Sequence, residues 1–292
     1  MSRSGATLIG FSAVLMWGLL AFLSKLAGEV PALQLTAMSF FVGGCVGMVT
    51  WPFRPGASRV LFLQKWQVWA LNVGCLFGCH LLYFIAVRNA PVVEVSLIAY
   101  TWPLLIVVFS ASALGERLSA HHLFGVALGV VGAVFVISKG QGLHFSKGLQ
   151  LGHLIAIPYA FLWAWFSVSI KKYGNIPTDI VVGFCFACAI LSGLTHVVLE
   201  PTLWPLSSAQ WTAILGLGLL PMGTAFYAWD FGMKHGDRLV LGAASYAAPL
   251  LSTLVLLASG FAVFHWSIAV GCLLITFGAI VAARDIIFPK PI

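Results

Sequence analysis

Charged residues are scarce in this sequence. Only 8% of its 292 residues are Asp, Glu, Lys or Arg, whereas an ordinary soluble domain contains about 25%. Hydrophobic residues make up 61% and the mean hydropathy is +1.02. The apolar residues come in runs of about 20, long enough to cross a hydrocarbon core of about 30 Å. Because a fold in water cannot bury that much apolar surface, we expect a protein that lies in a lipid bilayer.

Motifs for several chemistries are also missing. The chain has no Walker A loop and no soluble segment to hold one, which excludes an ATP-driven pump within this chain. It has no HExxH, no GxSxG and no pair of mid-span acids, so we expect neither an enzyme nor a cofactor. Cys185 and Cys188 form a CxxC, but no second pair or Cys/His cluster accompanies them. We therefore expect the six Cys residues to be packing residues and predict no metal site.

The apolar runs predict an all-α membrane protein of ten transmembrane helices. Breaks at charged, Pro and Gly residues place them near 6–26, 32–53, 66–88, 91–114, 119–138, 148–171, 177–199, 211–233, 239–262 and 264–284. The 15 Lys and Arg residues are scattered through the connections, which is typical of helix anchors and not of a nucleic-acid surface. Eleven lie on the side of the termini and four on the other side, so we expect both termini in the cytoplasm.

The sequence repeats itself at a constant offset of 146 residues. This shift pairs Trp17 with Trp163, Lys25 with Lys171, Pro31 with Pro177, Tyr100 with Tyr246, Pro103 with Pro249, Gly125 with Gly271 and Gly132 with Gly278. Residues 1–146 and 147–292 are therefore predicted to be two five-helix repeats within one membrane domain. Since five is odd, the second repeat enters the membrane from the opposite side, and inverted repeats are a recurring plan of secondary carriers.

Three short motifs resemble a known family. They are the opening ATLIG with Trp17 seven residues after Gly10, the segment EVSLIAYTWPLL from Glu94 to Leu105, and SYAAPLLS from Ser245 to Ser252. With the ten-helix plan, they resemble the EamA-type drug/metabolite transporter (DMT) superfamily, and in particular its aromatic amino acid exporter branch (YddG-type). The resemblance implies export of amino acids and related small compounds across a bacterial inner membrane, with no bound cofactor.

Mid-span tryptophans are the first candidate substrate-binding residues. Trp17 and Trp163 lie midway along their helices, away from the interfacial belt where membrane Trp is enriched. Flat indole rings suit an apolar or aromatic substrate, although packing against lipid or neighbouring helices also explains them. Trp102 is a third candidate on the same reasoning.

Two tyrosines at equivalent positions of the repeats are further candidates. Tyr100 and Tyr246 lie seven to nine residues into their helices, near the bilayer midplane, and Ser245 adjoins Tyr246. Pro103 and Pro249 follow the tyrosines by three residues and are predicted hinges, because Pro lacks a backbone donor. Pro is also common in membrane helices, which is the competing explanation.

Polar groups inside the spans are few. His80 and Tyr83 share one helix face as i and i+3 and are candidate binding residues; a hydrogen bond to a neighbouring helix is the alternative for His80. Glu94 lies in a first helical turn, where its charge suits the helix dipole. Asp230 is expected to pair with Lys234 at i, i+4. No coupling ion is predicted, since no acid lies clearly at the midplane.

We therefore expect a secondary carrier that exports aromatic and other neutral or amphiphilic amino acids by alternating access around a midplane cavity. Its expected partners are a small-molecule substrate and the bilayer, with no nucleic acid, and the chain is expected to be a monomer or a weak homodimer. A multidrug or cationic-drug exporter of the same fold is the alternative. A site for a drug cation would require an acidic residue or several aromatic faces, and the sequence offers the aromatic faces.

Overall fold

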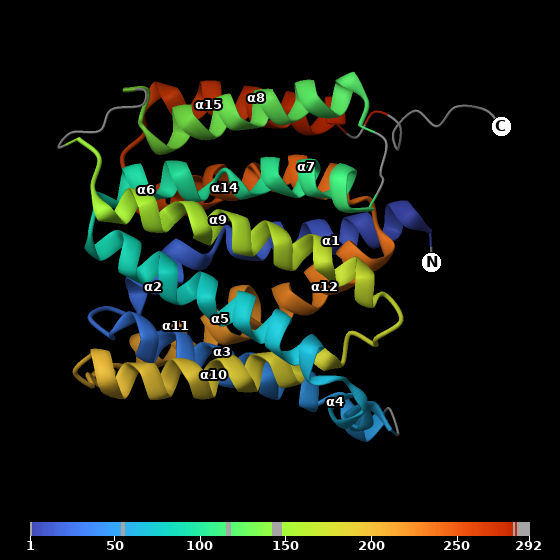
Figure 1. Ribbon diagram of the computed structural model, residues 1–292. Coiled ribbons are helices and arrows are strands. Elements are labelled where there is room, and N and C mark those ends of the chain that lie inside the picture. The colour runs from blue at the N-terminus through green and yellow to red at the C-terminus, as the bar shows by residue number, and fades with distance from the viewer. Residues whose placement is uncertain (1, 54–55, 115–117, 142–147, 283, 285–292) are drawn as a thin grey trace.

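The protein is an all-helical bundle over the residues that the structure, a computed structural model, describes: 2–53, 56–114, 118–141, 148–282 and 284. The α-helices are α1 (Arg3–Trp17), α2 (Leu20–Leu26), α3 (Ala32–Met48), α4 (Val60–Leu63), α5 (Trp66–Arg88), α6 (Val92–Ala99), α7 (Trp102–Leu114), α8 (Ala120–Ile137), α9 (Leu151–Ser169), α10 (Ile180–Leu199), α11 (Ser208–Leu219), α12 (Ala225–His235), α13 (Arg238–Ala244), α14 (Ala247–Ala258) and α15 (Trp266–Ala282). A π-helical segment, η4 (Leu220–Thr224), joins α11 to α12, and the 3₁₀ segment η3 (Ile170–Tyr173) follows α9. The α-helices run roughly parallel or antiparallel to one another (Figure 1).

Nine helical stretches in this described part are long and apolar enough to cross a membrane. They are Arg3–Leu26, Ala32–Phe53, Trp66–Arg88, Glu94–Ala113, Ala120–Ile137, Leu151–Ser169, Ile180–Leu199, Ser208–His235 and Arg238–Ala258. The tenth predicted span corresponds to α15, an apolar helix of only 17 residues, about 25 Å long at ~1.5 Å per residue. The nine stretches overlap the first nine predicted spans, so hydropathy located them well.

Four of the predicted spans are interrupted, two of them near the predicted hinges at Pro103 and Pro249. The regular α-helical hydrogen-bond pattern is interrupted at Gly18, at Tyr100, at Ser245 and in η4. Two of these breaks fall just before Pro103 and Pro249, which lie in the first turns of α7 and α14. Pro has no N–H to continue the hydrogen-bond ladder of the preceding turn, which explains an interruption at these places.

Helices from the first and second halves of the chain pack against each other. α1 lies along α12, α5 along α9, α3 along α10 and α8 along α15. In Figure 1 the α8–α15 pair forms one flank of the bundle and the α3–α10 pair the opposite flank. Close approach depends on small residues, because a Cβ on Gly125 would lie 2.5 Å from the carbonyl oxygen of Gly278 and one on Gly10 only 3.0 Å from the Cα of Gly232. Gly125 and Gly278 therefore allow α8 and α15 to approach each other closely.

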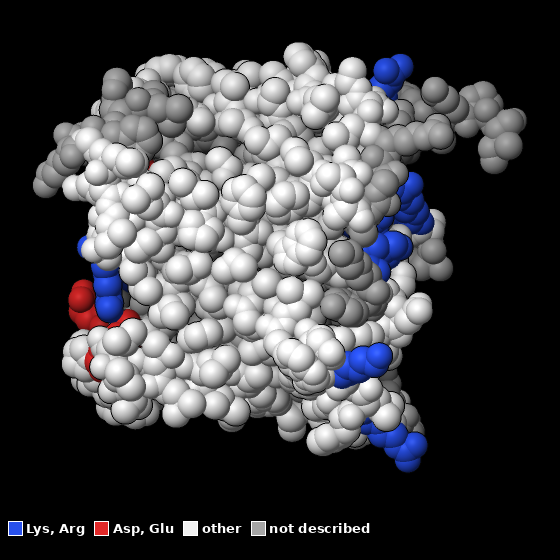
Figure 2. All heavy atoms as spheres, viewed as in Figure 1, with Lys and Arg blue, Asp and Glu red and all other residues white. Residues whose placement is uncertain are grey.

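The outer surface carries many large apolar side chains and little charge. On α10, for example, Leu194, Val197 and Val198 are more than 60% exposed, which suits a surface in contact with lipid and not with water. In Figure 2 most of the visible Lys and Arg side chains lie at the end of the bundle that holds the N terminus, and others lie at the opposite end. The acidic side chains visible in that view lie toward the opposite end.

Candidate functional site

Four tryptophans meet where α1, α7, α9 and α12 come together. Trp17 lies with its ring centroid 5.1 Å from Trp229, 5.5 Å from Trp163 and 6.3 Å from Trp102. Trp102 is 6.0 Å from Trp163 and 6.1 Å from Trp229, in edge-to-face contacts. We call these four residues the tryptophan cluster. Such ring pairs each contribute about 0.5–1.5 kcal/mol beyond the area they bury, so the cluster holds four helices together.

The indole N–H groups of this cluster differ in their partners. Trp17 donates to the Pro221 carbonyl oxygen at 3.1 Å, and Trp229 donates to the Ser167 hydroxyl at 3.1 Å. The Trp163 Nε1 is buried and has no hydrogen-bond acceptor among the described residues. A buried donor without an acceptor costs about 1–3 kcal/mol, so this N–H is available to an acceptor from a bound molecule.

Phe226, Phe40 and His80 extend the aromatic surface. Phe226 lies 6.3 Å from Trp17 and 5.9 Å from Trp163 between ring centroids, and Phe40 lies 5.5 Å from Phe226. The His80 ring is in edge contact with Phe40 at 5.0 Å. Its Nδ1 lies 2.7 Å from the backbone carbonyl oxygen one turn earlier in α5. Because a carbonyl oxygen can only accept a hydrogen bond, Nδ1 is the donor. The neutral ring therefore offers Nε2 as an acceptor beside the aromatic rings.

Three tyrosines form a neighbouring group. The Tyr83 and Tyr159 rings lie 5.5 Å apart, and the Tyr83 hydroxyl is 3.5 Å from the Ser96 hydroxyl. Tyr100 and Tyr159 both pack against the buried core cluster that contains Trp102, Trp163 and Trp229. Because His80 and Tyr83 are one turn apart on α5, they link the tyrosine group to the tryptophan cluster. Of the predicted site residues, Trp17, His80, Tyr83, Tyr100, Trp102 and Trp163 are thus brought into one region.

Tyr246 and Ser245, also predicted site residues, have other contacts. Tyr246 is 1% exposed and its ring lies where a Cβ on Gly129 of α8 would be, in a core cluster separate from the tryptophans. Its hydroxyl accepts from the Leu104 backbone N–H at 3.1 Å, which satisfies a donor beside the helix break. The Ser245 hydroxyl donates to the Leu241 carbonyl oxygen one turn earlier. These contacts favour structural roles, and a part in binding remains a prediction for both residues.

Sequence analysis missed Trp229, Phe226 and Tyr159. Trp229 lies four residues from the predicted end of its span, where membrane Trp is ordinary. A signal was nevertheless present: the offset of 146 residues carries His80 to Phe226 and Tyr83 to Trp229. Both partners of each pair contribute to the aromatic region.

Charged groups lie toward the two ends of the bundle. Glu94 and His153, both buried, are joined by a 2.8 Å contact, and the His153 Nδ1 accepts from the Gln150 backbone N–H. Nε2 must therefore carry the proton and donate to the Glu94 carboxylate. This partner of Glu94 was not predicted. The expected pair of Asp230 and Lys234 is confirmed at 2.7 Å.

Known proteins resemble this chain over nearly its whole length. The sequence model of the EamA-like transporter family matches residues 4–138. The aromatic amino acid exporter YddG of Ancylobacter novellus is 46% identical over 97% of this chain and 98% of its own length. This chain belongs to the EamA-like transporter family. The aromatic amino acid exporter YddG of Escherichia coli K12 is 26% identical over 96% of this chain and 97% of its own length.

A solved structure agrees with this membership. A chain of known crystal structure, 45% identical, superposes with a TM-score of 0.89 and covers 97% of this chain and 98% of that one. The family and the apolar helices together make the protein a multi-pass membrane transporter of small molecules. The predicted resemblance to EamA-type transporters and to the YddG-type branch is confirmed.

Proposed function

We propose that this EamA-family protein exports aromatic and other neutral or amphiphilic amino acids across the bacterial inner membrane. The names of its relatives in Ancylobacter novellus and Escherichia coli support the substrate class. The proposed mechanism is alternating access, with ten spans in two inverted repeats, residues 1–146 and 147–292, and both termini in the cytoplasm. The grouping of Lys and Arg at the end that holds the N terminus supports this orientation (Figure 2).

The packing of the helices supports the repeats. The offset of 146 residues makes α1 equivalent to α9 and α5 equivalent to α12. The α1–α12 pair of one half should therefore recur as the α9–α5 pair, and both pairs are observed. The α3–α10 and α8–α15 pairs each join equivalent helices. Two halves related in this way can exchange inward-open and outward-open arrangements around a shared central site.

The tryptophan cluster is the observation that carries the proposal. Trp17 and Trp102 come from the first half, and Trp163 and Trp229 from the second. An aromatic side chain bound between these indoles would touch both halves at once. The Trp163 N–H and the His80 Nε2 would then provide a donor and an acceptor at its edge. The rings are in mutual contact here, so binding requires them to separate, which couples substrate to the relative position of the halves.

Trp163→Phe tests this site with little disturbance of packing. The substitution keeps an aromatic ring, and it removes an N–H that has no described acceptor, so no protein hydrogen bond is lost. We expect the KM for L-tryptophan uptake into proteoliposomes to rise about three- to tenfold, the value of one hydrogen bond, with a small loss of thermal stability because a smaller ring replaces the indole. Trp163→Ala should lower transport further. An unchanged KM in both variants would contradict the site.

Trp204→Phe is the matched control, because Trp204 is 63% exposed and distant in sequence from the cluster residues. It should leave KM unchanged. The uptake panel should also contain drug cations, since the aromatic faces of the cluster suit cation–π contacts. Preferential transport of the cations over aromatic amino acids would favour the second candidate, a cationic-drug exporter of the same fold.

A further inference from the structure

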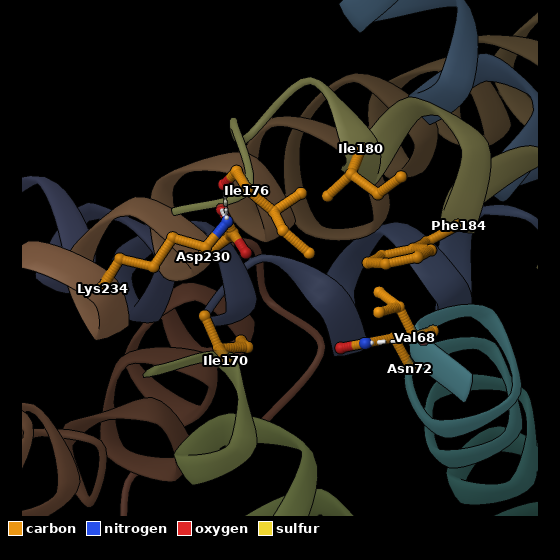
Figure 3. Close-up of a pocket in the computed structure, with 8 residues that line it drawn as sticks. All are labelled: Val68, Asn72, Ile170, Ile176, Ile180, Phe184, Asp230 and Lys234. Carbon is orange, nitrogen blue, oxygen red and sulfur yellow. Dashed lines mark hydrogen bonds and ion pairs between the residues drawn. The ribbon is translucent and has the colours of Figure 1, made fainter. Parts of the chain in front are cut away.

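A second polar feature, a pocket between α5, η3, α10 and α12, lies outside the aromatic region (Figure 3). It is partly open to solvent and, as it stands, has room for about one water molecule. Asp230 and Lys234 of α12 form one wall, Asn72 of α5 faces them, and apolar side chains such as Ile176 and Phe184 complete it. Thr7, near the N terminus, contacts the backbone of Asp237 just after α12, so the pocket lies at the end of the bundle that holds the N terminus.

The charges of this pocket are buried and paired with each other. Asp230 is 5% and Lys234 3% exposed. The Lys234 ammonium donates to the Asp230 carboxylate at 2.7 Å and to the Ile176 carbonyl oxygen at 2.8 Å. The Thr178 hydroxyl donates to the same carboxylate oxygen at 2.7 Å. The second Asp230 oxygen is turned away from Lys234, toward the interior of the pocket (Figure 3).

Such a pair is a weak stabiliser by itself. Removing two charges from water costs several kcal/mol per ion, and well-packed apolar residues of similar volume stabilise a protein equally well or better. A buried pair that lines a pocket is better explained by a ligand that needs both signs of charge. An α-amino acid carries an ammonium and a carboxylate on one carbon atom, which matches one carboxylate and one ammonium on one wall.

We propose that this pocket is a second amino-acid site, which binds the zwitterionic head group of the substrate before it reaches the tryptophan cluster. The substrate ammonium contacts the Asp230 carboxylate and the Asn72 amide oxygen, and the substrate carboxylate accepts from the Lys234 ammonium. The apolar wall around Ile176 and Phe184 takes the side chain. Asp230 directly follows Trp229, so the two sites lie on the same helix.

The pocket must widen to take a head group. If ammonium, Cα and carboxylate each take the ~30 Å³ share of a water molecule, the head group needs roughly 90 Å³, whereas the pocket as it stands has room for about one water molecule. Binding would also compete with the Thr178 and Ile176 contacts that tie α12 to the segment before α10. Occupancy of the pocket and release of α12 are therefore linked in this proposal, which rests on the proposed function.

Head-group analogues test the site directly. The purified full chain in lipid nanodiscs is titrated with L-phenylalanine, with phenethylamine, which lacks the carboxylate, and with 3-phenylpropanoate, which lacks the ammonium. The wild type should bind L-phenylalanine about tenfold or more tightly than either analogue, since each lacks one charge-assisted hydrogen bond. Wild-type binding without any preference for the zwitterion would overturn the proposal.

Two variants assign the charges. Asp230→Asn should weaken L-phenylalanine binding about tenfold and remove its advantage over 3-phenylpropanoate, while its advantage over phenethylamine remains. Lys234→Gln should remove the advantage of L-phenylalanine over phenethylamine and leave its advantage over 3-phenylpropanoate. Lys65→Gln, which removes an exposed Lys at the same end of the bundle, should change neither preference. A purely structural pair would weaken all three ligands in the same proportion, or none of them, and either result would overturn the assignment.

A labelling experiment covers the case in which these variants do not fold. Ile176→Cys places a thiol on the partly exposed rim of the pocket. L-Phenylalanine should slow the modification of this thiol by a membrane-impermeant maleimide, and phenethylamine should not. The same result is expected in a Trp163→Ala background. Equal slowing by both compounds, or by neither, would overturn the proposal. If the wild type transports no aromatic amino acid, the proposed function is wrong. If it transports them while both charge variants keep the wild-type head-group preferences, only the proposal of a second site is wrong.

Discussion

Lys234 and Arg88 occupy equivalent positions of the two proposed repeats, 146 residues apart, and their surroundings differ. The Lys234 side chain is 2% exposed, and its ammonium lies in a pocket against Asp230. The Arg88 side chain is 56% exposed and reaches Glu200 at 2.9 Å from outside the core. The duplicated cation is thus buried at the end that holds the N terminus and solvated at the other end.

Glu200 makes further contacts at its end of the bundle. Its second carboxylate oxygen accepts from the backbone N–H of Leu33 at 3.0 Å and lies 3.1 Å from the His196 Nδ1. A carboxylate at the N-terminus of α3 is well placed for the helix dipole. Glu200 therefore ties the start of α3 to the end of α10 without needing Arg88, whereas Asp230 and Lys234 depend on each other.

The largest effect expected from this difference is on folding. Lys234→Met leaves the Asp230 carboxylate buried without its cation, or forces it to take up a proton, and should lower the free energy of unfolding by about 3–5 kcal/mol. Arg88→Met should lower it by less than about 1 kcal/mol, because the side chain is half in solvent. Thermal unfolding in detergent compares the two variants. Equal losses would remove the distinction between the ends.

A double variant separates stability from binding. Asp230→Leu with Lys234→Met removes both buried charges, so much of the stability lost in Lys234→Met should return. Preference for a zwitterion over phenethylamine should not return. Recovery of both properties would mean that the pair only supports the fold.

The second comparison is between Tyr100 and Tyr246, whose sequence positions are equivalent. Tyr246→Phe removes the acceptor of the buried Leu104 N–H and should cost about 1–3 kcal/mol of stability, with KM unchanged. Tyr100→Phe should leave stability nearly unchanged and raise KM, because Tyr100 lies with the tyrosine group near the aromatic cluster. The same thermal unfolding and uptake assays apply. A rise in KM confined to Tyr246→Phe would reverse the two roles.

Hydropathy and the repeat predicted the spans and most of the aromatic region, but not the contacts of individual residues. A span in lipid is apolar on its outer and inner faces alike, so composition does not tell which face of the helix turns inward. Tyr246 and Tyr100 therefore looked alike in sequence although one packs on α8. The Glu94–His153 contact joins residues 59 apart through helix rotation and tilt, which no local pattern encodes.

The smallest effect is expected where the repeats differ by a single ring, at His80 and Phe226. His80→Phe makes the two positions chemically alike and keeps the edge contact with Phe40. Stability should change by less than about 1 kcal/mol, because the lost donor had bonded a helix carbonyl that keeps its backbone partner. The Nε2 acceptor disappears, so KM for aromatic amino acids should rise about two- to tenfold. Phe226→Leu is the contrasting variant, since it removes ring contacts with Trp17 and Trp163 but no hydrogen bond. If His80→Phe transported like the wild type while Phe226→Leu did not, the site would recognise its substrate by ring contacts alone, and the polar difference between the halves would carry no selectivity.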